Sequence, residues 1–192
     1  MDPSERSVYL TFDDGPIPQS TPFLLETLRS YNIKATFFMV GDNIRKHPEL
    51  FRQIVDEGHQ VGNHTFHHLG SFKHWTATYI MDTFKCQQMI AEAHCPTSSE
   101  PPLFRPPHGW LRHSVYYWLS KEFHIVMWDL VTRDYSKWLT PDDVFNNVKR
   151  YARNGSIITF HDSLKSIDKL HTALPESLKW LQEQGYAFKT FP

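Results

Sequence analysis

The sequence has little cysteine, no long apolar run and no excess of charge of either sign. Its 192 residues contain two cysteines, Cys86 and Cys95. They lie nine positions apart in one expected helix, where their side chains would point to opposite faces. We therefore expect buried or free thiols rather than a disulfide framework. No apolar stretch is long enough to cross a bilayer, so a membrane span is not expected.

A charge pattern that would attract nucleic acid is also missing. The formal net charge is −1 with histidine neutral, and Lys and Arg are scattered rather than gathered in a run. Internal repeats and low-complexity segments are absent. We predict one domain over residues 1–192, a length that can bury a sizeable core. Residues 1–6 do not resemble a signal peptide. If a leader was trimmed from the chain, the protein could act at the cell envelope or outside the cytoplasm. The sequence therefore predicts neither the compartment nor the oligomeric state.

Histidine and aromatic residues are abundant. There are 12 histidines, and five of them fall between positions 59 and 74. Clustered imidazoles indicate metal or proton chemistry. Aromatic residues make up 15% of the chain and include six tryptophans. Trp75, Trp110 and Trp138 fall in expected loops, where they could stack on sugar rings, although partial burial is expected for at least one.

Short apolar runs alternate with helical patterns along the chain. Seven strands are expected, at 7–12, 35–40, 60–63, 103–105, 125–128, 156–160 and 187–190. Helices are expected after an N-cap at Thr21, from Pro48 to Gly58, near 78–93 and 113–121, from Thr140 and near 172–184. Apolar strands separated by helices favour an α/β fold with a parallel sheet covered on both faces. An open doubly wound sheet and a closed barrel both satisfy this pattern.

Ionisable residues stand at the ends of these strands. They are Asp13 and Asp14, His64 and His68, Arg105, Asp129, and His161 with Asp162. The carboxyl ends of parallel strands share one edge of a sheet, where active sites are built. We therefore expect these groups to converge.

The first two groups predict a metal centre. Taken alone, Asp13-Asp14-Gly15-Pro16 is an ordinary turn sequence, and a His-x-x-x-His pair is often solvated surface. The i, i+4 spacing of His64 and His68 would place both on one face of a helical turn, which suits two ligands of one metal. Asp14 would complete a two-histidine, one-carboxylate set for one divalent ion, zinc with cobalt or nickel as substitutes. Asp13 would then act as general base.

The other groups complete a hydrolytic reaction. Such a metal acidifies water and polarises a carbonyl, and Asp13 takes the proton of the water. A backbone N–H near His108 or Gly109 would stabilise the oxyanion, and His161 would protonate the leaving group. Arg105 would pair with a carboxylate and hold it ionised. A surface arginine and a histidine bonded to a carbonyl are the ordinary alternatives for these last two.

The chain resembles the polysaccharide deacetylases of carbohydrate esterase family 4, the NodB-homology domain, from about Val8 to its end. The motif T-F-D-D-G-P is present at 11–16, and H-[ST]-x-x-H is present at 64–68. The stretch 33–38 is also typical, and R-x-P-x-G matches 105–109. The resemblance implies a distorted (β/α) barrel of seven or eight strands.

Two motifs depart from the family pattern. The fourth normally reads Asp, two residues, then Asp-Trp, and here Val131 replaces the first Asp and Tyr135 the Trp. The resemblance would assign that first Asp to tuning the catalytic histidine, so Asp129 or Asp134 is expected as the partner of His161. In the fifth motif, L-x-H, Thr159 replaces a leucine that helps to line the acetyl pocket. Substrate-binding positions are expected at His108, Gly109, Trp128 and Tyr135.

The sequence thus predicts hydrolysis of an acetyl group on a glycan. The preferred substrate is N-acetyl on a GlcNAc-containing polymer such as peptidoglycan or chitin. The alternatives are O-deacetylation of a polysaccharide such as xylan, and a carbohydrate-binding pseudoenzyme that keeps its metal. A non-haem iron oxygenase shares the ligand set. It needs no base beside the ligand carboxylate, so Asp13 argues against it.

Overall fold

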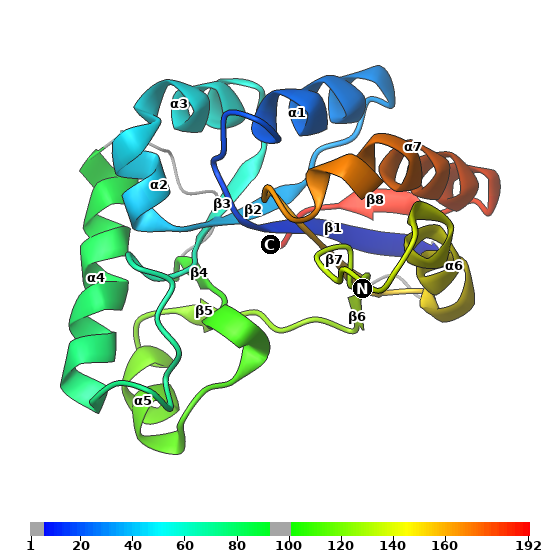
Figure 1. Cartoon of the computed structure of the whole chain (residues 1–192). Helices are drawn as coiled ribbons and strands as arrows, with labels where there is room; N and C mark the ends of the chain where they lie inside the picture. Colours follow the sequence, from blue (N-terminus) through cyan, green and yellow to red (C-terminus); the bar gives the residue numbers. More distant parts are fainter. Residues whose placement is uncertain (1–5, 93–100) are drawn as a thin grey trace. The chain divides into compact units, whose positions relative to one another are not determined.

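The structure, a computed structural model, describes residues 6–92 and 101–192. The chain divides into two compact units. Unit 1 contains Met1–Asp13, Ile17–Thr36 and Trp128–Phe191, and unit 2 contains Asp14–Pro16, Phe37–Met127 and Pro192. In each unit, helical segments separate the strands that follow one another along the chain (Figure 1). Among the described residues, no helix has the length and apolar content needed to cross a membrane.

Unit 1 is built around strand β1 (Ser7–Asp14), which is buried up to its last residue. It pairs in parallel with β7 (Ile157–His161) and with β8 (Ala187–Lys189), and β6 (Leu130–Val131) pairs with β7. An apolar composition along the whole strand is expected where both faces of a parallel sheet are covered. The register places Asp13 opposite His161 at the carboxyl ends of β1 and β7.

Three helices belong to unit 1: α1 (Thr21–Ser30), α6 (Pro141–Tyr151) and α7 (Ile167–Glu183). The predicted cap of α6 is confirmed. Thr140 forms a capping box in which the Asp143 N–H donates to the Thr140 hydroxyl and the Asp143 carboxylate accepts the Thr140 N–H. The predicted N-cap of α1 is wrong, because Ser20 precedes the helix and Thr21 is its first residue.

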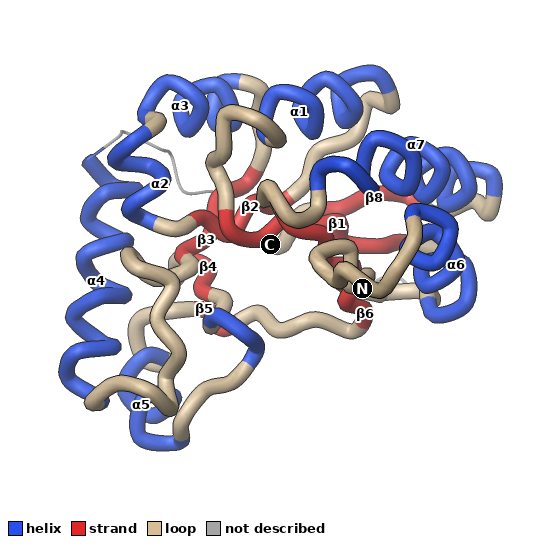
Figure 2. The backbone as a smooth tube through the Cα atoms, viewed as in Figure 1, coloured by secondary structure: helices blue, strands red, loops and turns tan. Residues whose placement is uncertain are grey.

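Unit 2 contains strands β2 (Thr36–Met39), β3 (Gln60–Asn63), β4 (Leu103–Phe104) and β5 (His124–Ile125), in the order β5-β4-β3-β2. Its helices are α2 (Gly41–Lys46), α3 (Pro48–Asp56), α4 (Thr76–Glu92) and α5 (His113–Leu119), with a short 3-10 turn η1 (Pro107–Gly109). Buried side chains of α4, β4, α5 and the turn after α5 form one cluster, which consists of Tyr79, Phe104, Val115, Leu119 and Phe123. This cluster packs α4 and α5 against β4, and Figure 2 shows the helices and strands of unit 2 as a backbone tube.

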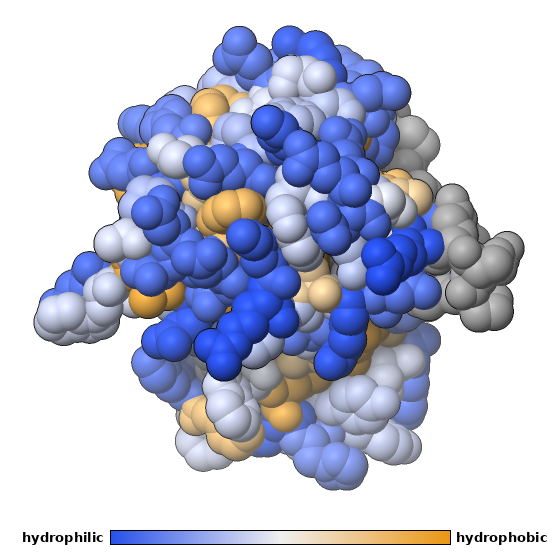
Figure 3. Space-filling view, turned by 90° about the vertical axis from the view of Figure 1, so that its right-hand side faces the viewer, coloured by the Kyte–Doolittle hydropathy of each residue, from blue (hydrophilic) through white to orange (hydrophobic). Residues whose placement is uncertain are grey.

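The predicted α/β class with parallel strands is confirmed, and most element boundaries agree to within three residues. The fifth predicted strand is wrong. The residues at 124–131 form two separate strands, β5 and β6, with 126–129 between them. Helix α2 was not predicted, and α7 begins five residues earlier than expected. Cys86 is buried in α4, whereas Cys95 lies outside the described residues. The molecular face in Figure 3 is mostly hydrophilic, with hydrophobic residues scattered over it.

Candidate active site

Strand β1 ends in the two consecutive aspartates, and their environments differ. The Asp13 side chain is buried, while the Asp14 side chain is 28% exposed. Asp14 has a φ of 84°, a left-handed conformation that ends the extended strand. The turn that follows is held by two bonds: Asn43 donates its side-chain N–H to the Asp14 carbonyl at 2.9 Å, and Val40 N–H donates to the Gly15 carbonyl at 3.1 Å.

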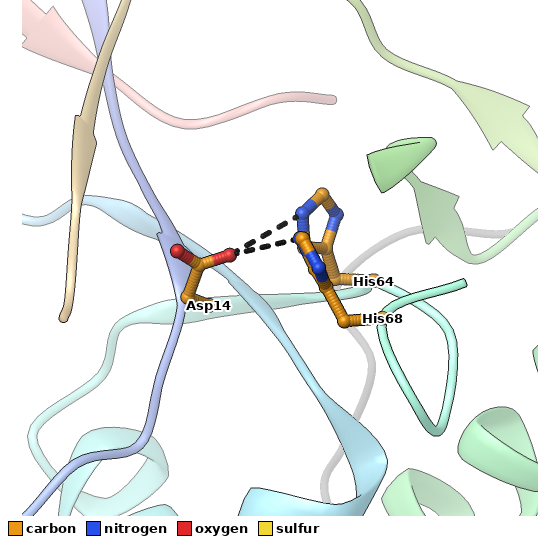
Figure 4. A group of neighbouring side chains, drawn as sticks. All are labelled: Asp14, His64 and His68. Atoms are coloured by element: carbon orange, nitrogen blue, oxygen red, sulfur yellow. Dashed lines mark ion pairs between the residues drawn. The ribbon is translucent and has the colours of Figure 1, made fainter. Parts of the chain in front are cut away.

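Asp14, His64 and His68 form the one group among the described residues that could hold a metal ion. One ligand atom from each residue lies within 4.8 Å of the others. Asp14 Oδ1 is 3.7 Å from His64 Nε2 and 3.2 Å from His68 Nε2 (Figure 4). Two imidazoles and one carboxylate facing a common point match the donors that zinc and related divalent ions take. The predicted ligand set therefore meets in one place.

His64 is oriented for ligation by a bond on the far side of its ring. Its Nδ1 lies 2.7 Å from the Arg105 carbonyl oxygen, which can only accept a hydrogen bond. Nδ1 therefore carries the hydrogen, and Nε2 presents its lone pair toward Asp14. Fixing the tautomer in this way is a general feature of histidine metal ligands.

His64 and His68 do not lie on a helical turn, so that part of the prediction is wrong. The segment after β3 is a loop. Thr65 has a φ of 62° and His68 a φ of 55°, the left-handed region that non-glycine residues rarely adopt. The two rings still approach, with centroids 5.1 Å apart, because the loop rather than a helix brings them together.

In unit 1, His161 is paired with Asp134. His161 Nδ1 lies 2.7 Å from Asp134 Oδ1, and the His161 backbone N–H donates to Asp134 Oδ2 at 2.7 Å. Asp134 is fully buried and also accepts the Tyr135 N–H at 3.0 Å. With the carboxylate accepting from Nδ1–H, the Nε2 atom of His161 is left to hold or release a second proton.

Asp129, the other candidate partner of His161, is engaged elsewhere. Its carboxylate accepts the Ile157 N–H at 3.0 Å and lies 3.3 Å from the Arg153 guanidinium. Of the two aspartates considered, Asp134 is thus the one bonded to His161. A carboxylate partner for His161 is thus present although Val131 stands at the usual Asp position.

Arg105 is fully buried at the end of β4. Its guanidinium donates to the carbonyls of Val126 at 3.3 Å and Met127 at 3.0 Å. It also lies over the Phe38 ring, 4.1 Å from the centroid. The Val126 and Met127 carbonyls, which follow β5, thus bond to the Arg105 side chain. The surface alternative for Arg105 is wrong.

The expected substrate-binding residues are partly accessible. His108 is exposed, has a φ of 62°, and its ring lies 4.8 Å from that of His68. Partial desolvation of the imidazole lowers the pKa of His108, and the nearby His68 and Lys73 lower it further. The Gly109 N–H donates to the Pro106 carbonyl at 3.1 Å, so it is already used. Tyr135 is exposed and its ring meets that of His161 edge to face, while Trp128 is half-buried.

Two buried aspartates were given no role from the sequence. Asp162, fully buried, accepts hydrogen bonds from the hydroxyls of Ser20 and Thr21, and its own N–H donates to the Asp13 carbonyl at 2.8 Å. Ser20, at the N-cap position of α1, makes no side-chain hydrogen bond to the helix. Asp82 of α4 binds the loop between His64 and His68. An aspartate within a helix usually indicates a solvated face, so no sequence signal marks Asp82.

A group of side chains that could hold a metal ion, preceded directly in the sequence by a buried aspartate, is typical of metal-dependent hydrolases. Residues 1–123 match the polysaccharide deacetylase family model. The chain belongs to this family. A peptidoglycan-N-acetylglucosamine deacetylase of Bacillus cereus is 35% identical, over 97% of this chain and 87% of the relative.

Solved structures agree with this assignment. A family 4 carbohydrate esterase from Streptomyces lividans, in complex with acetate, is 32% identical, with a TM-score of 0.86 over 97% of this chain and 93% of the other. A family 4 pseudoenzyme from Bacillus anthracis is 28% identical, with a TM-score of 0.83 over 97% of this chain and 64% of the other. The likeness confirms the α/β fold of this esterase family, the distorted barrel that the resemblance implied.

Proposed function

We propose that the protein is a metal-dependent deacetylase that removes N-acetyl groups from GlcNAc residues of a peptidoglycan- or chitin-type glycan. The observation that carries the proposal is the pairing of a metal-binding group, Asp14 with His64 and His68, with the adjacent buried carboxylate of Asp13. Membership of the polysaccharide deacetylase family and the name of the Bacillus cereus relative support the reaction and the substrate.

In this proposal, three residues hold the metal ion and Arg105 supports them. Asp14, His64 and His68 would hold one divalent ion, zinc with cobalt or nickel as substitutes. When bound, such an ion lowers the pKa of a water molecule and polarises the acyl carbonyl. The Arg105 carbonyl keeps His64 in the ligating tautomer. Arg105 itself would help to keep a catalytic carboxylate ionised, because its buried guanidinium is a fixed positive charge.

The proton transfers fall to unit 1 residues. Asp13 is the residue of β1 directly before the ligand Asp14. Asp13 takes the proton of the attacking water. His161 gives a proton from Nε2 to the leaving amine, while Asp134 holds Nδ1–H. The backbone N–H of Gly109 already donates to the Pro106 carbonyl. The backbone N–H of His108 is therefore the better candidate to donate a hydrogen bond to the oxyanion.

A panel of acetylated glycans tests the proposal. Release of acetate is measured from peptidoglycan, from N-acetylated chitooligosaccharides and from O-acetylated xylan. We expect kcat/KM to be at least about tenfold higher for the N-acetylated substrates, since about 1.4 kcal/mol of transition-state discrimination suffices. Acetate from xylan alone would make the protein an O-esterase. Glycan binding without acetate release from any substrate would make it a pseudoenzyme.

Two exposed tryptophans are candidates for sugar stacking. Trp75 and Trp110 are 83% and 69% exposed, contrary to the expectation that at least one of the loop tryptophans is partly buried. Their loops are joined through Ser71, which donates to the Trp110 carbonyl at 2.9 Å and accepts the Arg112 N–H at 3.0 Å. Because hydrogen bonds already hold these loops, little conformational entropy should be lost when a sugar binds against an exposed ring.

Replacing Trp110 by Ala is expected to weaken glycan binding about two- to tenfold, the effect of losing about 0.5–1.5 kcal/mol of aromatic contact. The thermal midpoint should stay near that of the wild type because the ring is exposed. Trp118→Ala is the matched control, since this tryptophan of α5 is also exposed and has no assigned sugar contact. Titration with a chitooligosaccharide measures both. If Trp110→Ala lowers only the thermal midpoint, Trp110 supports the fold and not the sugar.

A further inference from the structure

The loop that carries two metal ligands is held in a conformation it would not adopt unaided. It contains two left-handed non-glycine residues, Thr65 and His68. Such residues persist only where surrounding contacts over-determine them. On one side, helix α2 supplies those contacts. The Gly41 N–H donates to the Thr65 carbonyl at 3.0 Å, and the Asp42 N–H donates to the Phe66 carbonyl at 2.9 Å.

On the other side, the loop N–H groups converge on Asp82 of helix α4. Asp82 Oδ2 accepts the Phe66 N–H at 3.0 Å and the His67 N–H at 2.9 Å. Its Oδ1 lies 2.5 Å from His67 Nδ1, and the Asp82 carbonyl lies 3.2 Å from the Phe66 nitrogen. Asp82 is only 7% exposed. One buried carboxylate thus binds two consecutive peptides and one side chain between the two ligand histidines.

We propose that Asp82 is a positioning residue that presets the His64–His68 loop for metal binding. Both Asp82 oxygens are bonded to the loop, and Asp82 does not belong to the group of side chains that could ligate the ion. It therefore acts through the backbone. A loop that samples other conformations binds metal only in the competent fraction of molecules, so apparent affinity falls in proportion to that fraction. The inference rests on the proposed metal site.

Zinc affinity of purified variants tests this role without any assay of activity. Asp82→Ala should weaken zinc binding by about 10- to 100-fold, the range found for residues that support metal ligands. Asp82→Asn should have a smaller effect, because the amide oxygen can still accept the two backbone N–H groups. The control is Asp42→Ala, which removes a carboxylate beside the same loop. The Asp42 side chain pairs with Arg45 and Lys46 rather than the loop, so zinc affinity should stay within about threefold.

Amide hydrogen exchange of the metal-free protein gives a second readout. Exchange at Phe66 and His67 should accelerate in Asp82→Ala, and at unaltered positions of β3 it should not. A folded Asp82→Ala variant with wild-type zinc affinity and wild-type exchange would overturn the inference. If that variant does not fold, Asp82→Asn decides, with unchanged affinity and exchange as the overturning result. Failure of the wild type to bind zinc would instead refute the proposed function, and amide exchange would still judge Asp82.

Discussion

Asp13→Asn is expected to lower the deacetylation rate by about a hundredfold or more while metal affinity stays near that of the wild type. The amide has the size of the carboxylate but cannot take a proton from water, and a general base contributes about 10²- to 10⁴-fold. Asp13 is buried at the end of β1 and is not one of the three clustered ligand residues. Its loss should therefore leave the metal in place.

Asp14→Asn is expected to behave in the opposite way. Asp14 Oδ1 faces the Nε2 atoms of both histidines, and the substitution removes the single negative charge of the ligand group. Metal content after dialysis should fall, and activity should fall with it. Removing the metal from the wild type by chelation should abolish activity, and added zinc, cobalt or nickel should restore it.

Metal content and single-turnover rate, measured on the same preparations, separate the two roles. If Asp13→Asn and Asp14→Asn lose metal to the same extent, the assignment of one as base and the other as ligand is wrong. Full activity of metal-free wild-type protein would refute the metal dependence altogether. Asp42→Asn serves as the control, because Asp42 is a surface carboxylate paired with Arg45 and Lys46.

The ligand set was predictable because two regularities act together. Polar residues directly after apolar strands fall at one edge of a parallel sheet. The spacing of His64 and His68, with the adjacent aspartates, adds a recognisable donor set. The structure confirms that Asp14, His64 and His68 come together. Neither regularity depends on details of side-chain packing, so both can be applied to a sequence.

The conformation between the ligands was not predictable from the same patterns. The i, i+4 spacing suggested a helical turn, whereas the loop contains left-handed residues. Its shape is set by hydrogen bonds to Asp82, more than a dozen residues away, and to the N-terminus of α2. Periodicity does not encode such contacts. The two-residue strands β5 and β6 were missed in part for a similar reason, since they are too short to show any period.

The partner of His161 shows the same limit. Residues two apart in a strand point to the same side of the sheet, so Asp129 was expected to point the same way as Val131. This made Asp129 a plausible partner for His161. In the structure, Asp129 binds Arg153 and the Ile157 N–H. Asp134 lies past β6, where the turn brings its carboxylate onto both the ring and the backbone of His161. The sequence narrowed the choice to two carboxylates, and only the path of the loop decided between them.

Asp134→Asn is expected to shift the alkaline limb of the pH–rate profile to lower pH. A carboxylate in contact with an imidazole favours the protonated form of the ring. Below the limb, His161 carries the proton it must donate; above it, the proton is lost. Without the carboxylate the proton is lost at a lower pH, so the active range narrows from the alkaline side.

The Asp134→Asn substitution should also lower kcat at every pH. Asn can donate to Nδ1, which would place the remaining proton of neutral His161 on Nε2 in the wrong tautomer. Asp129→Asn is the matched control and should leave the limb in place, because Asp129 binds Arg153 instead. The profile of kcat/KM against pH, measured on one N-acetylated oligosaccharide, compares the three proteins. If neither variant moves the limb, another group sets it.

His161→Ala then decides the role of the ring. We expect this variant to lose about 10²- to 10⁴-fold in deacetylation rate. Near-normal deacetylation by the variant would show that the leaving amine takes its proton from another group.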